Sequence, residues 1–214
     1  GAYLDAKQKY GRTPLFEAIR SPAAARKEIV ELLMTKGAKV PALHLAAYMG
    51  DMGKVKKWLQ DGADINAQAD DGSTALHAAA CSGSKDMVQF LISRGANVDP
   101  NDASGMTPLY YAATHNAGQI VDLLVAKGAD VNAQNETEDG YGYTLIHYAI
   151  DQDDSKDVVK LLISKGANVN VGDWDGFTPL IYAIWEDDKD MVELLISKGA
   201  DVNQQDNYGC TALH

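Results

Sequence analysis

The chain has 214 residues, of which 46% are hydrophobic and 23% are charged, a composition typical of soluble globular proteins and not of disordered chains. Its formal net charge of −11 argues against nucleic acid and anionic membranes as partners, because both are bound through clusters of lysine and arginine. No apolar run approaches the roughly 20 residues that a membrane-spanning helix needs.

Two cysteines, Cys81 and Cys210, lack the spacing of a zinc site or of a disulfide framework. We therefore expect neither a metal nor a cofactor. So few cysteines slightly favour the reducing cytoplasm. Because the sequence does not begin with Met, a periplasmic or secreted location stays an alternative if a leader has been removed.

A short motif of the Thr-Pro-Leu-His type recurs along the chain at a period of about 33 residues. Its copies begin at Thr13, Thr74, Thr107, Thr144, Thr178 and Thr211, and a further copy, Pro41-Ala42-Leu43-His44, lacks the Thr. A Gly-Ala pair followed by Lys, Asp or Asn forms a second marker, at Gly37, Gly62, Gly95, Gly128, Gly166 and Gly199. The two markers alternate throughout, which predicts a tandem repeat.

Between these markers the sequence predicts two short helices in each repeat. The Thr is expected to cap the first helix, because its hydroxyl can accept a backbone N–H and Pro or Ala follows it. Apolar pairs one turn apart mark the second helix, as in Met87, Val88, Leu91 and Ile92. The second helix is expected to end at the repeated Gly, which can take the left-handed conformation.

The stretches Thr74-Ala75-Leu76-His77 and Gly199-Ala200-Asp201 resemble the signature of the ankyrin repeat family, and the resemblance covers nearly the whole chain. It implies an all-α solenoid of stacked helix pairs with projecting β-hairpin fingers, which form a concave face with the first helices. Because one repeat cannot bury its apolar face alone, we expect a single ankyrin-repeat domain over residues 1–214. The units are expected at residues 7–39, 40–66, 67–99, 100–132, 133–170 and 171–203, with a partial unit at 204–214.

Four departures from the family pattern are visible. Only four positions separate Gly37 from Pro41, so the finger between the first two units is expected to be missing. The segment from Gly128 to Thr144 is longer than its counterparts, which predicts an extended finger. The usual Gly between the two helices is replaced, and the sequence stops inside the last motif. The replacing residues are Asn116, Asp153 and Asp187.

Candidate catalytic chemistry is confined to histidine and cysteine. In the ankyrin family the motif histidine braces the base of the finger through hydrogen bonds, which implies a structural role and neither catalysis nor metal binding. His77 and Cys81, four residues apart, could pair as base and nucleophile, but no orienting group or oxyanion donor accompanies them. The resemblance also places Cys81 at a variable surface position, so we expect no enzyme. The motif histidines are His44, His77, His147 and His214.

Aromatic residues gather at the positions where ankyrin proteins contact their partners, which flank the finger glycine and follow the first helix. Trp and Tyr are common interface anchors because they bury a large area for little side-chain entropy. As an alternative, about half of the set, including Tyr143 and Phe177, packs sideways between neighbouring fingers. The resemblance implies a partner-binding set of Met106, His115, Tyr141, Tyr143, Asp151, Gln152, Trp174, Phe177, Trp185, Glu186 and Tyr208.

These features predict a non-catalytic module that binds a folded partner protein on its concave face and is monomeric when free. Acidic clusters around Asp151 and Glu186 favour a partner with a basic or amide-rich surface. A narrower version is an inhibitor or immunity protein that covers an enzyme. One alternative is an architectural segment of a longer polypeptide, and a third, less favoured one is an enzyme.

Overall fold

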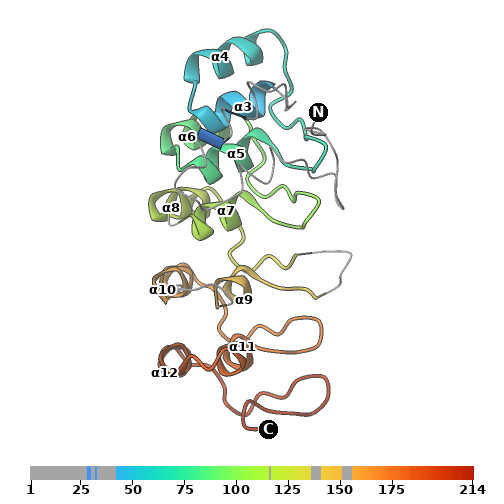
Figure 1. The fold of residues 1–214 in the computed structure, drawn as a ribbon, viewed down its shortest axis with the longest axis vertical. Coiled ribbons are helices and arrows are strands. Elements are labelled where there is room, and N and C mark those ends of the chain that lie inside the picture. Colours follow the sequence, from blue (N-terminus) through green and yellow to red (C-terminus); the bar gives the residue numbers. More distant parts are fainter. Residues whose placement is uncertain (1–27, 30–31, 33–41, 116, 136–140, 151–155) are drawn as a thin grey trace. The chain divides into compact units, whose positions relative to one another are not determined.

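The computed structural model describes residues 28–29, 32, 42–115, 117–135, 141–150 and 156–214. The chain divides into two compact units, Gly1–Ala129 and Asp130–His214, which we describe separately. The described residues form helices α3 to α12, labelled as in Figure 1. The predicted gap between Gly37 and Pro41, the tip of the extended finger, and positions 116 and 153 lie outside these residues.

Three helix pairs make up the described part of the first unit. A largely buried first helix precedes a second helix that is buried on one side: all residues from Ala75 to Cys81 are buried in α5, whereas α6 buries Met87, Val88 and Leu91. Helix α5 packs against both α3 and α7. The pairs are α3 (Ala42–Met49) with α4 (Met52–Gln60), α5 (Ala75–Ser82) with α6 (Lys85–Ser93), and α7 (Pro108–Thr114) with α8 (Gly118–Ala126).

The second unit contains two helix pairs, α9 (Leu145–Ile150) with α10 (Lys156–Ser164), and α11 (Pro179–Trp185) with α12 (Lys189–Ser197). The first helices α9 and α11 pack against each other and lie between the second helices and the fingers (Figure 1). Their core includes Ile146, Leu162, Leu180 and Leu195, each at most 2% exposed. Neighbouring repeats thus supply each other's buried surface, as expected for stacked helix pairs.

The predicted starts and ends of the helices are confirmed, although the expected hydroxyl cap is made by Thr107, which accepts from the amide of Tyr110 (3.4 Å), and not by Thr178. Thr107 and Thr178 occupy N-cap positions before Pro108 and Pro179, where the missing N–H of proline costs nothing. Asp187, which replaces a Gly between helices, has a positive φ of 53°, a conformation that Asp tolerates better than most residues. The repeated Gly after each second helix also adopts positive φ, between 92° and 97°, at Gly62, Gly95, Gly128, Gly166 and Gly199.

The fingers are tight loops, and among the described residues a single isolated antiparallel bridge, between Gln134 and Thr144, represents the β-hairpin that the resemblance implies. An aspartate at the start of the turn organises the finger from within. Asp102 accepts hydrogen bonds at Oδ1 from the amides of Ser104 (2.8 Å) and Met106 (3.0 Å). Asp173 and Asp206 do the same in their fingers, so the tip geometry is fixed by a carboxylate in place of a strand ladder.

Successive fingers are joined by a repeated backbone hydrogen bond. The amide of Ala103 donates to the carbonyl of Asp71 (2.8 Å), and that of Trp174 donates to the carbonyl of Tyr141 (2.9 Å). The amide of Asn207 donates to the carbonyl of Asp175 (2.9 Å). Ala103, Trp174 and Asn207 therefore occupy equivalent positions, whose side chain varies while the backbone bond is kept.

The motif histidines brace the fingers, which confirms the structural role expected for them. In the second unit, His147 Nδ1 accepts from the backbone N–H (3.2 Å) and the hydroxyl (2.9 Å) of Thr144. Its Nε2–H donates to the carbonyl of Phe177 (3.1 Å) in the next finger. Because Nδ1 accepts and the carbonyl can only accept, the ring is the neutral Nε2–H tautomer. His77 repeats this pattern with Thr74 and with the carbonyl of Met106 (3.0 Å).

His44, whose motif lacks the Thr, has lost the hydrogen bonds that this Thr donates in the other repeats. Its Nε2 reaches the carbonyl of Ser73 (2.9 Å), as in the other repeats. Its Nδ1 is buried without a hydrogen-bond partner in the part of the chain that the structure describes. Position 41 is a proline, which has neither a hydroxyl nor a backbone N–H to donate.

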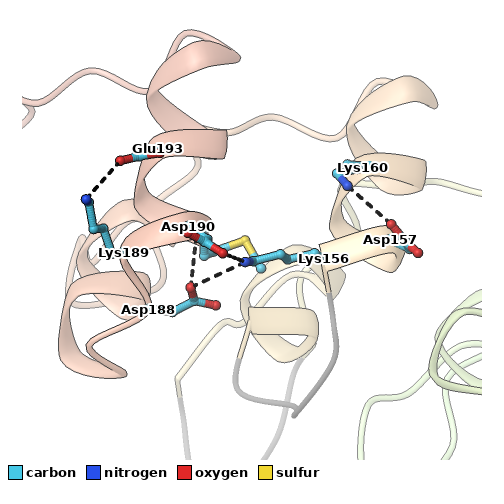
Figure 2. Close-up of polar contacts among 8 residues, drawn as sticks. Lys156, Asp157, Lys160, Asp188, Lys189, Asp190 and Glu193 are labelled. Carbon is cyan, nitrogen blue, oxygen red and sulfur yellow. Dashed lines mark hydrogen bonds and ion pairs between the residues drawn. The ribbon is translucent and has the colours of Figure 1, made fainter.

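Ion pairs join the second helices of the second unit on their solvent side. Figure 2 shows Lys156 of α10 pointing toward Asp188 and Asp190 at the start of α12, with Lys156 hydrogen-bonded to Asp190. Lys160 pairs with Asp157, and Lys189 with Glu193, within single helices. Such exposed pairs add little stability, so their main consequence is to neutralise charge on this side of the unit.

The burial of the neutral His147 ring leads to a prediction about the stability of the protein in acid. Burial lowers the pKa of His147 from 6.5 to about 4, so the folded state holds the neutral ring. The stabilisation is complete above the unfolded pKa near 6.5 and is lost as pH falls toward 4, by up to about 3 kcal/mol. We expect His147→Gln to unfold at lower urea concentration than the wild type near pH 7. The gap should narrow toward pH 4, whereas a gap independent of pH would contradict the assignment.

Candidate protein-binding surface

Aromatic rings from three fingers and the first helix α11 form a continuous network in the second unit. Tyr141 stacks on Tyr143 (ring centroids 5.4 Å apart), and Tyr143 meets Tyr182 edge to face at 5.6 Å. Tyr182 contacts Trp185 at 5.2 Å, and Trp185 contacts Phe177 at 4.8 Å. Phe177 in turn stacks with Tyr208 at 6.1 Å. We call this set, together with Trp174, the aromatic surface.

A buried carboxylate anchors the network to the fold. Asp173, which organises the finger through Oδ1, accepts at Oδ2 from the hydroxyl of Tyr182 (2.7 Å). Burial and hydrogen bonds to Tyr143 and Asp173 raise the pKa of Tyr182, so its hydroxyl stays protonated and donates. Tyr111 and Asp102 form the same pair in the first unit (2.5 Å). The ring at the centre of the aromatic surface therefore has a fixed position.

Exposure separates the network into two groups. Tyr143 and Phe177 are half-buried between their neighbours, as expected for rings that pack sideways between fingers. Four other rings present about half or more of their side chains to solvent: Tyr141 at 48%, Trp174 at 48%, Trp185 at 57% and Tyr208 at 70%. Large rings held by other rings and left open are the arrangement expected of interface anchors.

Trp174 is positioned by a glycine of the preceding finger. A Cβ added to Gly142 would lie 2.1 Å from Cδ1 and 2.3 Å from Nε1 of the indole. Only a residue without a side chain lets the indole rest on the backbone there. The amide of Trp174 bonds to Tyr141, and its carbonyl accepts from the side chain of Asn207 (2.7 Å). The indole is therefore held in one place before any partner arrives.

The remaining residues of the predicted partner-binding set do not belong to the aromatic surface or lie outside the described residues. Glu186 is exposed at the end of α11, next to Trp185, whereas Asp151 and Gln152 fall outside the described residues. Met106 and His115 belong to the unit that ends at Ala129. Met106 is only 7% exposed, so we leave it out of the proposed surface, and His115 is half-buried.

The expectation that Cys81 occupies a surface position is wrong. Its side chain is 2% exposed, because α5 is buried between α3 and α7. The sulfur of Cys81 contacts His115, whose Nε2 lies 3.6 Å from Sγ, whereas His77 is hydrogen-bonded to Thr74 and Met106. Within the described residues, no group of three or more His, Cys, Asp or Glu side chains is arranged to hold a metal ion.

Sequence reasoning missed three contributors to the aromatic surface. The predicted partner-binding set does not include Tyr182, Gly142 or Asn207. The pairing of Asp173 with Tyr182, nine positions apart and repeated as Asp102 with Tyr111, is a signal that the sequence does contain. The contact of Gly142 with Trp174 depends on finger register, which no local pattern reveals.

Comparison with known proteins identifies the repeat. A family model described as "Ankyrin repeats (3 copies)" matches residues 43–135 and 134–206. The chain is also similar to a chain in the solved structure titled "Bd0816 Predatory Endopeptidase from Bdellovibrio bacteriovorus in complex with immunity protein Bd3460". That match has a TM-score of 0.67 and 32% sequence identity, and it covers 82% of this chain and 90% of the other. Comparison with curated proteins gave no match.

Helix pairs in tandem, with a recurring histidine brace and variable finger side chains, define a repeat protein whose scaffold serves protein–protein interaction. The chain belongs to the ankyrin repeat family. This family membership confirms the all-helical repeat fold and the protein-binding role expected from the sequence. The ankyrin fold is typically non-catalytic. None of the helices in the described residues has the length and apolar character to cross a membrane.

The contact between the indole of Trp174 and Gly142 can be tested by substituting two equivalent glycines. Gly142 and Gly209 hold the same finger position with positive φ, 63° and 81°, so alanine strains the backbone at both. A Cβ meets the indole at Gly142 but nothing within 4 Å at Gly209. With Trp58 and Trp185 replaced by Phe, we expect Gly142→Ala to shift the emission and acrylamide quenching of Trp174. Gly209→Ala should leave the emission and the quenching of Trp174 unchanged. Equal changes in the two glycine variants would contradict the contact between Gly142 and the indole.

Proposed function

We propose that this chain binds a folded partner protein through the aromatic surface of residues 130–214, and that the partner is an endopeptidase whose activity the bound chain blocks. The observation that carries the proposal is the set of four exposed rings, Tyr141, Trp174, Trp185 and Tyr208, on the face made by fingers and first helices. Rings of this size lose little side-chain entropy on binding when they are already held by neighbours.

The choice of an endopeptidase is supported by the similar solved structure, whose title describes an endopeptidase in complex with an immunity protein. At 32% identity over most of both chains, the two proteins share a fold, whereas side chains at variable finger positions set the partner. Inhibition by coverage also needs no reactive group in the inhibitor. We therefore propose that the chain is non-catalytic, folds as one ankyrin-repeat domain and is monomeric when free.

The partner's contact surface is proposed to be basic or amide-rich. Residues 130–214 contain 17 Asp and Glu but only 5 Lys and no Arg, so this half carries the chain's whole net negative charge. An acidic field of this kind accelerates encounter with a basic partner, and short-range ring contacts then determine how long the complex lasts.

The test is to purify the chain and, separately, the endopeptidases of its source organism. For each enzyme, the inhibition by the chain and the Kd of the complex are then measured. Replacing both Trp174 and Trp185 by Ala should raise the Kd of the inhibited enzyme at least tenfold, since buried Trp anchors contribute on the order of 2 kcal/mol or more. The melting temperature should stay nearly unchanged, because both side chains are about half exposed.

Ile196 provides the matched control. It is 46% exposed but lies on the second helix α12, away from the fingers. Ile196→Ala should leave inhibition unchanged. Undiminished inhibition by the double Trp variant would remove the aromatic surface from the contact, and the absence of inhibition of any endopeptidase would overturn the proposed partner.

A further inference from the structure

The acidic and basic residues of the second unit are segregated between its two sides. All five lysines lie on α10 and α12 or directly after them, namely Lys156, Lys160, Lys165, Lys189 and Lys198. The fingers and first helices of this unit, at residues 130–150, 166–185 and 199–214, contain no lysine or arginine. Three of the lysines are paired with carboxylates of the second helices (Figure 2). The aromatic surface therefore has no basic residue of its own.

Carboxylates stand directly beside the exposed rings of this surface. Asp175 follows Trp174, and its Oδ1 accepts from the hydroxyl of Tyr208 (3.0 Å), which holds the carboxylate in place. Glu186 and Asp187, both exposed, follow Trp185. Each indole thus has a negative side chain one residue away.

The first unit contains a half-buried ring, Phe90, whose face lies next to cations. Phe90 is covered by two of them, with Lys56 Nζ at 5.5 Å and Arg94 Cζ at 5.0 Å from the ring centroid. Trp174 and Trp185 are larger and better partners for a cation, because the indole face carries the strongest negative potential of the natural rings. Among the described residues, neither indole has a cation within contact distance.

We infer that the aromatic surface is a receptor for basic side chains of the partner, with an arginine guanidinium lying over the indole of Trp174 or Trp185 and pairing with the adjacent carboxylate. A guanidinium fits both halves of such a site, since its plane stacks on rings and its N–H groups pair with carboxylates. The inference rests on the proposed function for its choice of face, and it narrows a basic or amide-rich partner to one that supplies arginine.

The experiment needs no endopeptidase. The full chain, labelled with ¹⁵N in its three tryptophans, is titrated with the peptide acetyl-Arg-Gly-Arg-Gly-Arg-amide. A second titration uses the same peptide with citrulline in place of arginine, which keeps the planar shape but replaces one NH2 donor by a carbonyl oxygen and removes the charge. We expect the indole N–H signals of Trp174 and Trp185 to move with the arginine peptide and much less with the citrulline peptide. Trp58, in the other unit, serves as the internal control and should not move.

Variants separate ring stacking from general attraction to an acidic protein. Trp185→Leu keeps an apolar side chain but removes the ring, and should raise the Kd of the arginine peptide roughly two- to fivefold. Asp175→Asn should act in the same direction, whereas Ile196→Ala should leave the Kd unchanged. Equal shifts with both peptides, unmoved indole signals, or a Kd indifferent to Trp185→Leu and Asp175→Asn would each overturn the inference.

The outcomes distinguish this inference from the proposed function. Arginine-dependent shifts at Trp174 and Trp185 without inhibition of any endopeptidase would support the receptor and reject the proposed partner. Inhibition that depends on both tryptophans, combined with equal shifts for the two peptides, would support the partner and reject the cationic recognition.

Discussion

The hydrogen bond from a buried histidine to a carbonyl of the next finger is the constraint on which the arrangement of this protein depends. His147 accepts two hydrogen bonds from Thr144 at Nδ1 and donates one hydrogen bond from Nε2–H to the carbonyl of Phe177. It thereby connects the start of one first helix to the finger that follows it. A group that could only donate or only accept would not serve both sides, which explains why a neutral imidazole occupies this position.

Where the histidine brace and the aspartate turns occur, they fix the backbone of the finger, so the side chain at the tip can vary without loss of the finger. Ala103, Trp174 and Asn207 make the same backbone bond to the preceding finger with unrelated side chains. Binding character can therefore change from finger to finger while the scaffold stays constant, which is how one repeat fold serves many partners. In this chain the change runs toward large rings and acidic residues in the second unit.

Much of this architecture could be predicted from sequence because its determinants are local. Thr107 and Pro108 specify a helix start, the repeated Gly specifies a helix end, and His77 lies within one turn of the Thr that it contacts. The prediction that was wrong and the contacts that were not predicted both involve residues of neighbouring repeats. Cys81 is buried by the helices on either side of α5, and Gly142 touches Trp174 only because the finger register brings residues 32 positions apart together. Periodicity identifies equivalent positions, but it does not say which side chain of one repeat covers another.

The segregation of charge in the second unit completes the argument for a directional surface. Lysines on the second helices are engaged by carboxylates of the same helices, so much of the negative charge there is compensated locally. By contrast, Asp175 lies in a finger that contains no basic residue, and Glu186 and Asp187 are exposed directly after Trp185 in the turn that follows α11. An approaching basic protein is therefore drawn more strongly to the side that carries Trp174 and Trp185 than to the opposite one. Long-range attraction and short-range ring contact then act on the same face, so the encounter leads directly to the surface that can hold the partner.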